Sequence, residues 1–100
     1  MELKEFTEII KNNNIVVADM SASWCGPCKA LAPIIDELET EFTSVTFLKL
    51  DADEDNEVCL NYKIRNVPTV LFFKNGEVVS KLVGLNKKES YTNTINELLK

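Results

Sequence analysis

The hydrophobic positions of the chain alternate between helical spacing and the continuous runs typical of buried strands. Apolar residues at helical spacing predict a short amphipathic helix over residues 3–11. The apolar, largely β-branched run from Ile15 to Ala18 predicts a strand that is buried on both faces. A longer helical stripe then predicts a helix from about 26 to 42. Pro33 lies inside it and should kink it, because the ring removes one backbone donor and crowds the previous turn.

The second half of the chain continues the alternation of strands and helices. Residues 45–50 predict a second strand, residues 55–62 a short helix and residues 70–73 another buried strand. Acidic residues from Asp51 to Glu57 surround the start of the short helix, where negative charge suits the helix dipole. A solvated helix start is favoured over a site for cations or basic partners.

A turn and a capping pattern predict the last two elements. Asn75-Gly76 provides the positive φ angles that a type I′ turn requires, so residues 77–83 should pair with the preceding strand. Asn86 and Glu89 are spaced as in a capping box and predict the start of a final helix. Its buried stripe is expected to contain Tyr91, Ile95, Leu98 and Leu99.

The predicted order of elements is α-β-α-β-α-β-β-α. Helices between strands favour parallel pairing, and the hairpin adds antiparallel edges. We therefore expect an α/β fold with a central mixed sheet of four to five strands and helices on both faces. A length of 100 residues indicates one domain, residues 1–100, and 45% hydrophobic with 27% charged residues is ordinary globular usage. This composition excludes a disordered tail and a disulfide miniprotein.

Charge and residue usage narrow the function. Eleven basic and sixteen acidic residues give a net charge of −5, which removes the electrostatic basis for nucleic-acid binding. The chain has no histidine, so Ser-His and Cys-His nucleophile pairs and histidine metal sites are excluded. No apolar run exceeds four residues, so we expect neither a signal peptide nor a membrane span. We expect a cytoplasmic protein, whose cysteines are not a disulfide scaffold.

The chemistry is predicted at Cys25-Gly26-Pro27-Cys28, between a buried strand and a helix. This spacing brings two thiols together at a helix start, where exposed amides and the helix dipole lower the pKa of the first cysteine. We therefore expect Cys25 to attack a disulfide and Cys28 to resolve the mixed disulfide. Structural zinc is disfavoured, because zinc takes four ligands and the chain offers only one further cysteine, Cys59. Inert core thiols are disfavoured by the irregular turn around the pair.

The segment Trp24-Cys25-Gly26-Pro27-Cys28-Lys29 resembles the active-site signature of the thioredoxin family. The resemblance runs from about residue 14 to the end of the chain. Further matches are Ala18-Asp19, Pro33, Val67-Pro68-Thr69, Phe72-Phe73-Lys74-Asn75-Gly76 and Val83-Gly84. It implies a thioredoxin fold and a monomeric protein disulfide reductase with a Cys25–Cys28 disulfide in its oxidised form. It also implies no bound cofactor or metal, electrons from NADPH through thioredoxin reductase, and disulfide-containing proteins as substrates.

The resemblance assigns roles to further residues. Asp19 matches the family's buried proton acceptor for Cys28, although an Asp at a strand end can equally reach water. Lys49 matches a lysine near that carboxylate, with an ordinary solvated lysine as the alternative. Pro68 matches the family's cis-proline. The apolar substrate surface is implied to comprise Trp24, Val67, Pro68, Gly84 and Leu85, with backbone near Val67 bonding an extended segment.

Several positions depart from the family pattern. Met20-Ser21 replaces an aromatic pair that is common before the active site, and Leu85 is larger than the usual alanine, which narrows the expected substrate choice. The family's first strand is reduced to residues 1–3 or missing. Cys59 is interpreted as a small, semi-buried apolar residue rather than a regulatory thiol. The alternative function is a binding or adaptor module with an incidental dithiol, and turnover of disulfides distinguishes the two.

Overall fold

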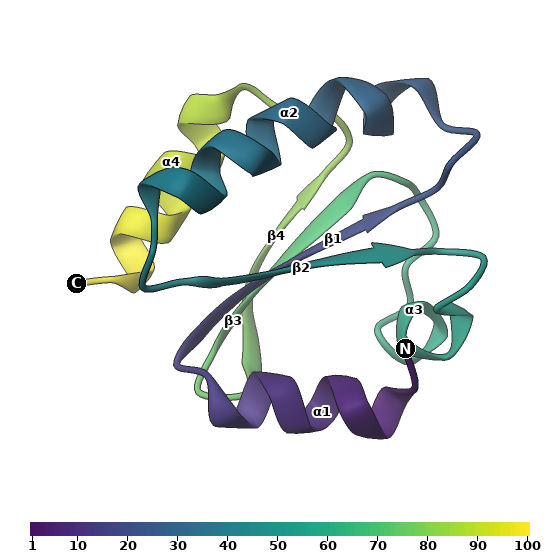
Figure 1. Cartoon of the computed structure of the whole chain (residues 1–100), viewed down its shortest axis with the longest axis horizontal. Helices are drawn as coiled ribbons and strands as arrows, with labels where there is room; N and C mark the ends of the chain where they lie inside the picture. The colour runs from purple at the N-terminus through teal and green to yellow at the C-terminus, as the bar shows by residue number, and fades with distance from the viewer.

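The computed structural model describes residues 1–100 and confirms the predicted order of elements (Figure 1). The elements are α1 (Leu3–Asn12), β1 (Ile15–Ser21), α2 (Gly26–Glu41), β2 (Thr46–Asp51), α3 (Asn56–Asn61), β3 (Thr69–Lys74), β4 (Glu77–Val83) and α4 (Lys88–Leu98). Pro33 lies within α2, and that helix continues beyond it to Glu41.

The sheet has four strands in the order β2-β1-β3-β4. β1 pairs with β2 in parallel and with β3 in antiparallel, and β3 pairs with β4 in antiparallel. The central strand β1 continues through Asp19 to Ser21, three residues past the predicted apolar run. The strand continues past the apolar run because its backbone is paired on both sides, with Asp19 in register with Lys49 and with Val70.

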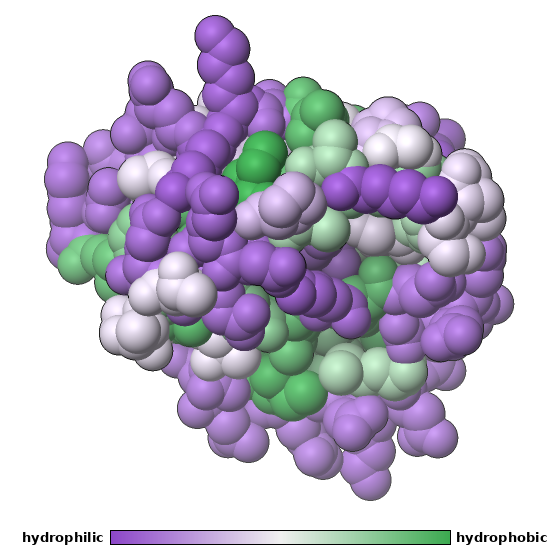
Figure 2. All heavy atoms as spheres, turned by 45° about the horizontal axis from the view of Figure 1, so that its top comes forward, coloured by the Kyte–Doolittle hydropathy of each residue, from purple (hydrophilic) through white to green (hydrophobic).

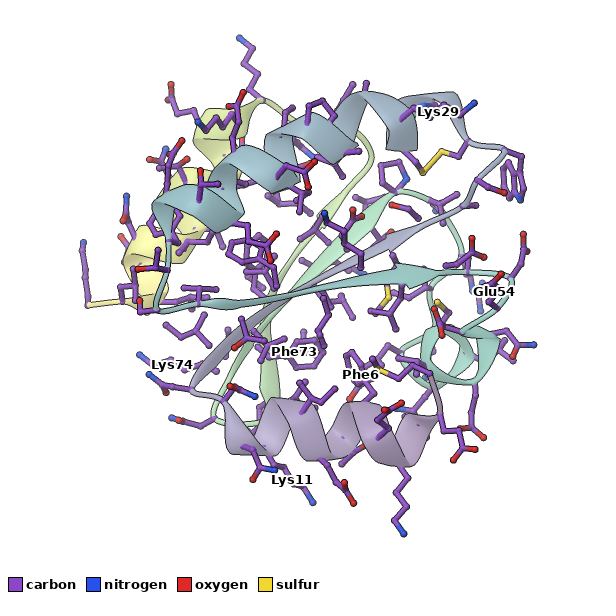
Figure 3. All side chains as sticks on the ribbon, in the orientation of Figure 1. Phe6, Lys11, Lys29, Glu54, Phe73 and Lys74 are labelled. Atoms are coloured by element: carbon purple, nitrogen blue, oxygen red, sulfur yellow. A yellow bond between two sulfur atoms is a disulfide. The ribbon has the colours of Figure 1, made fainter.

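Helices cover both faces of the sheet, with α2 and α4 on one side and α1 and α3 on the other (Figure 1). Phe6 of α1 and Phe73 of β3 face one another between helix and sheet, with ring centroids 5.5 Å apart (Figure 3). The opposite layer is filled by fully buried side chains that include Ile35, Phe72 and Tyr91. On the face turned forward in Figure 2, hydrophilic side chains cover most of the surface, with hydrophobic atoms visible between them. The two-sided core explains why β1 and β3 read as unbroken apolar runs.

The ends of the elements confirm the predicted hairpin turn and correct the predicted helix cap. Asn75 and Gly76 both have positive φ, at 54° and 84°, as the predicted hairpin turn requires. The predicted capping box at Asn86 is wrong. The N-cap of α4 is Lys87, without a side-chain cap, and the Asn86 amide instead donates hydrogen bonds to the carbonyl oxygens of Val83 and Gly84. The Asn86 side chain therefore stabilises the turn before α4 rather than the start of that helix.

Residues 1–3 do not form a fifth strand. Helix α1 begins at Leu3, and the sheet within residues 1–100 has four strands, the lower number of the predicted range. No helix of the structure is long and apolar enough to cross a membrane.

Candidate functional site

Cys25 and Cys28 form a disulfide at the start of α2, with their Cα atoms 5.3 Å apart. Figure 3 shows the bond next to Lys29. Cys25 is the N-cap of α2, and the backbone N–H of Cys28 donates to Cys25 Sγ over 3.2 Å. Both cysteines are about 95% buried, whereas Gly26 and Pro27 between them are exposed. A donor and the positive end of the helix dipole therefore point at Cys25 Sγ, which stabilises a thiolate there when the pair is reduced.

The loop before β3 forms a wall beside the two sulfur atoms. The Val67-Pro68 peptide bond is cis, as the resemblance implied. The carbonyl oxygen of Val67 lies 3.7 Å from Cys25 Sγ. The backbone N–H of Gly84 donates to the carbonyl oxygen of Pro68 over 2.7 Å and joins the end of β4 to this loop. Val67 thus lies next to Cys25, and Pro68 and Gly84 are joined to the same loop.

Two exposed apolar side chains belong to the predicted substrate surface. Trp24, next to Cys25 in the chain, has 69% of its surface exposed, and Leu85, next to Gly84, has 48% exposed. The indole Nε1 of Trp24 donates to Asp53 Oδ2 over 3.0 Å. This bond orients the tryptophan ring toward the acidic segment before α3. Exposed large apolar side chains at a site of this kind are typical of a surface that contacts a partner.

Asp19 is a buried carboxylic acid on the central strand, with only 5% of its surface exposed. Burial raises the pKa of Asp19 above its ordinary value, because it penalises the charged form. The hydroxyl of Ser21 donates to Asp19 Oδ1 over 2.8 Å, and this bond and the charge of Lys49 partly offset the rise in pKa. The structure therefore excludes the alternative of a strand-end Asp that reaches water.

Lys49 is in strand register with Asp19, but its ammonium group binds elsewhere. It forms an ion pair with the Asp36 carboxylate on α2. That hydrogen bond is the main cause that raises the pKa of Lys49. The resemblance implied that Lys49 lies near Asp19. The two residues are in strand register and line one cavity, and the charge of Lys49 lowers the pKa of Asp19 without a hydrogen bond between them.

A cavity of about 400 Å³ is lined by both Asp19 and Cys28. Its lining includes Asp19, Ser21, Cys28 and Lys49. The sequence analysis noted Ser21 only as a departure from an aromatic pair and assigned it no role. The signal that identifies it is its position two residues after Asp19, because residues spaced by two lie on the same face of a strand.

Cys59 lies apart from this cavity, in the core between α3 and the sheet. It is 5% exposed, and its Sγ lies 3.9 Å from Met20 Sδ. Burial raises the pKa of the Cys59 thiol and so disfavours a reactive thiolate. This environment fits the predicted packing role. No group of three or more His, Cys, Asp or Glu residues is arranged to hold a metal ion.

A cysteine pair at a helix N-terminus, beside a cis-proline and on a four-stranded mixed sheet, defines the class of thiol–disulfide oxidoreductases. The sequence model of the thioredoxin family matches residues 1–97. The chain is 42% identical over 96 residues to thioredoxin from Mycoplasmoides gallisepticum, a match that covers 96% of this chain and 92% of that protein. It is 43% identical over 82 residues to thioredoxin-1 from Saccharomyces cerevisiae, covering 82% of this chain and 80% of that protein. The chain belongs to the thioredoxin family.

Solved structures confirm the predicted thioredoxin fold. Mitochondrial thioredoxin 3 from Saccharomyces cerevisiae, in its oxidized form, is similar with a TM-score of 0.91 and 32% identity, covering 96% of this chain and 90% of that one. Thioredoxin from Plasmodium falciparum gives a TM-score of 0.89 and 38% identity, covering 96% and 93%. Family membership and the Cys25–Cys28 pair together make this chain a dithiol–disulfide reductase rather than an adaptor with an incidental dithiol.

Proposed function

We propose that Cys25 is the attacking thiolate and Cys28 the resolving thiol in the reduction of protein disulfides. The Cys25 thiolate attacks one substrate sulfur, the substrate S–S bond breaks, and the other substrate sulfur leaves as a thiolate that takes up a proton. Cys28 then loses its proton and attacks Cys25 Sγ, which forms the Cys25–Cys28 disulfide and releases the second substrate thiol. Two electrons pass to the substrate. The bond from the Cys28 N–H to Cys25 Sγ carries this assignment, because it favours the charged form of Cys25 alone.

In this mechanism Asp19 takes the proton of Cys28 during resolution. Both residues line one cavity, and the pKa of Asp19 is raised by burial toward the range where a carboxylate accepts protons efficiently. Lys49 has a minor, through-space effect that favours the charged form of Asp19. Ser21 holds Oδ1 of Asp19 in place.

The substrate segment binds across the loop that contains the cis-proline. The carbonyl oxygen of Val67 accepts a backbone N–H of an extended substrate, in the manner of strand addition. The exposed Trp24 and Leu85, with the half-buried Gly84, provide the apolar contact surface, and the buried Pro68 shapes the loop beneath it. The exposed leucine at position 85 occupies more of this surface than alanine does, and it narrows the range of side chains that fit next to the scissile disulfide.

We further propose that residues 1–100 work as one monomeric domain in the cytoplasm. The dithiol is regenerated by an NADPH-dependent thioredoxin reductase, so that electrons flow from NADPH to substrate disulfides without a cofactor bound by this chain. The test is a coupled assay with NADPH, a bacterial thioredoxin reductase, this protein and insulin. NADPH consumption that requires all components supports the proposal. NADPH consumption that is unchanged when this protein is omitted contradicts the proposal. Insulin reduction that proceeds with dithiothreitol, but with none of several thioredoxin reductases and NADPH, contradicts it as well.

A further inference from the structure

A small pocket lined by basic side chains lies beside the substrate surface. It has a volume of about 160 Å³. One wall is the segment after α3 and the other is the end of β4. The lining residues, here called the basic pocket, are Lys63, Ile64, Arg65, Asn66, Thr69, Lys81 and Val83.

The basic pocket is continuous with the loop that faces the dithiol. Asn66 and Thr69 directly flank Val67 and Pro68, and the Thr69 hydroxyl donates to the carbonyl oxygen of Asn66 over 2.6 Å. At the other wall Val83 precedes Gly84, whose N–H is bonded to Pro68. A substrate segment that crosses this loop therefore brings its flanking side chains within reach of the pocket.

The three cations of the basic pocket have no partner in the protein. The ion pairs of the structure involve the N-terminal amine, Lys49, Lys88 and Lys100, and none involves Lys63, Arg65 or Lys81. No Asp or Glu lines the pocket, although the chain carries a net charge of −5. Unpaired positive charges gathered in one concave place attract an anionic group.

The backbone at Lys63 adds an independent observation. Lys63 has a φ of 56°, in the left-handed region that favours glycine, and it follows Tyr62, the C-cap of α3. A lysine at such a position is less stable than a glycine by about 1 kcal/mol. The chain places a charged side chain at the pocket despite this energetic disadvantage.

We propose that the basic pocket binds a carboxylate side chain of the substrate protein, close in sequence to the cysteine that Cys25 attacks. The preferred substrates are thus disulfides in locally acidic segments. The inference deepens and rests on the proposed function. At Trp24, the chain neighbour of Cys25, the charge is of the other sign: Asp53 holds the indole and Glu54 follows it, so acidic substrate residues next to Trp24 are disfavoured. The site is therefore expected to select both the charge and the direction of the segment.

The experiment compares disulfide-bonded peptides that are identical except for Glu or Gln a few residues from the cysteine, placed on one side or the other. The readout is the ratio of kcat/KM for the Glu peptide to that for the Gln peptide. We expect a ratio of about 5 for one placement at low ionic strength, from a few exposed charge pairs. The ratio should fall below about 2 near 0.5 M salt, because salt screens exposed charges.

Variants locate the effect. The double variant Arg65→Gln with Lys81→Gln should lower the ratio to below about 2, whereas Lys4→Gln, the same charge change on exposed α1, should leave it at the wild-type value. The inference is overturned if wild-type ratios are near 1 for both placements, or if the double variant retains the preference. A ratio lowered equally by Lys4→Gln overturns it too, since net charge is then the cause. Reduction of neither peptide refutes the proposed function itself, and the inference with it.

Discussion

Replacing the buried acid by its amide, Asp19→Asn, separates the role of its charge from the role of its shape. The side chain is 5% exposed, and asparagine has nearly the same volume, so no cavity forms. The Ser21 hydroxyl can still donate to the amide oxygen as it does to Oδ1. The new NH2 group lacks an assigned acceptor, and a buried donor without a partner costs about 1–3 kcal/mol. At low pH we therefore expect the variant to be somewhat less stable than the wild type.

The difference in stability between the two proteins should shift in favour of the variant as the pH rises. Below about pH 3.9, the unfolded value for Asp, the acid holds its proton in both states of the wild type. Between that pH and the raised folded pKa of Asp19, the unfolded state has lost a proton that the folded state keeps. The wild-type free energy of unfolding then falls with pH, by at most about 1.4 kcal/mol per pH unit for one proton. The variant has no such proton, so it gains stability relative to the wild type across this window.

The same substitution removes the proposed proton acceptor. General-base catalysis contributes about 10²–10⁴-fold, so resolution of the mixed disulfide by Cys28 should slow by at least about 10²-fold, or about 2.7 kcal/mol of barrier. The assay is a single turnover with an aromatic disulfide that releases one coloured thiolate when Cys25 attacks and another when Cys28 resolves. Only the second phase should slow.

Urea midpoints of both proteins from pH 4 to 9 complete the measurement, with Glu8→Gln as a control at an exposed acid on α1, away from the cavity and from Trp24. Curves that stay parallel at every pH, together with an unchanged second phase, would refute both the raised pKa and the assigned role of Asp19.

Three further predictions test the remaining assignments. In the reduced protein Cys25 should be alkylated before Cys28 near neutral pH, and Cys28→Ser should accumulate mixed disulfides at Cys25; peptide mapping that finds Cys28 modified first contradicts the assignment. Cys59→Ala should lose about 1 kcal/mol of stability, because it removes a buried sulfur in contact with Met20, yet keep activity within about tenfold; a larger loss in the insulin assay would show a chemical role. Lys63→Gly should raise the free energy of unfolding by about 0.5–1 kcal/mol and Tm by roughly 2–8 °C, because glycine fits the left-handed backbone; an unchanged or lower Tm would refute the strain at this position.

Much of the fold was predictable because its signals are local. Buried strands appear as continuous apolar runs, since helices cover both faces of the sheet, and Asn75-Gly76 predicts its turn through backbone conformation alone. The capping box failed because Asn86 has two competing acceptors, the carbonyl oxygens of Val83 and Gly84, that exist only once β4 and the turn are in place. Tertiary context thus decided between two local hydrogen-bonding patterns.

The sequence identified some residues of the site but not the side-chain contacts of others. The cysteine pair, Asp19 and Pro68 are identified by a contiguous motif and by matching positions in a family. The ion pair of Lys49 with Asp36 and the contact of Ser21 with Asp19 depend on side-chain directions in three dimensions. The basic pocket combines residues of the segment after α3 with residues of β4. These two segments come together only when β3 pairs with β4. No local sequence pattern indicates that charged residues far apart in the chain lie close together in the fold.

The central claim is that this chain turns over protein disulfides through Cys25. The most direct measurement is the reduction of insulin disulfides with dithiothreitol as the electron source, with wild type compared with Cys25→Ser at catalytic amounts. We expect wild type to accelerate the reaction over many turnovers, and Cys25→Ser to give only the uncatalysed rate of dithiothreitol. Equal acceleration by both proteins, or none by the wild type, would contradict the account.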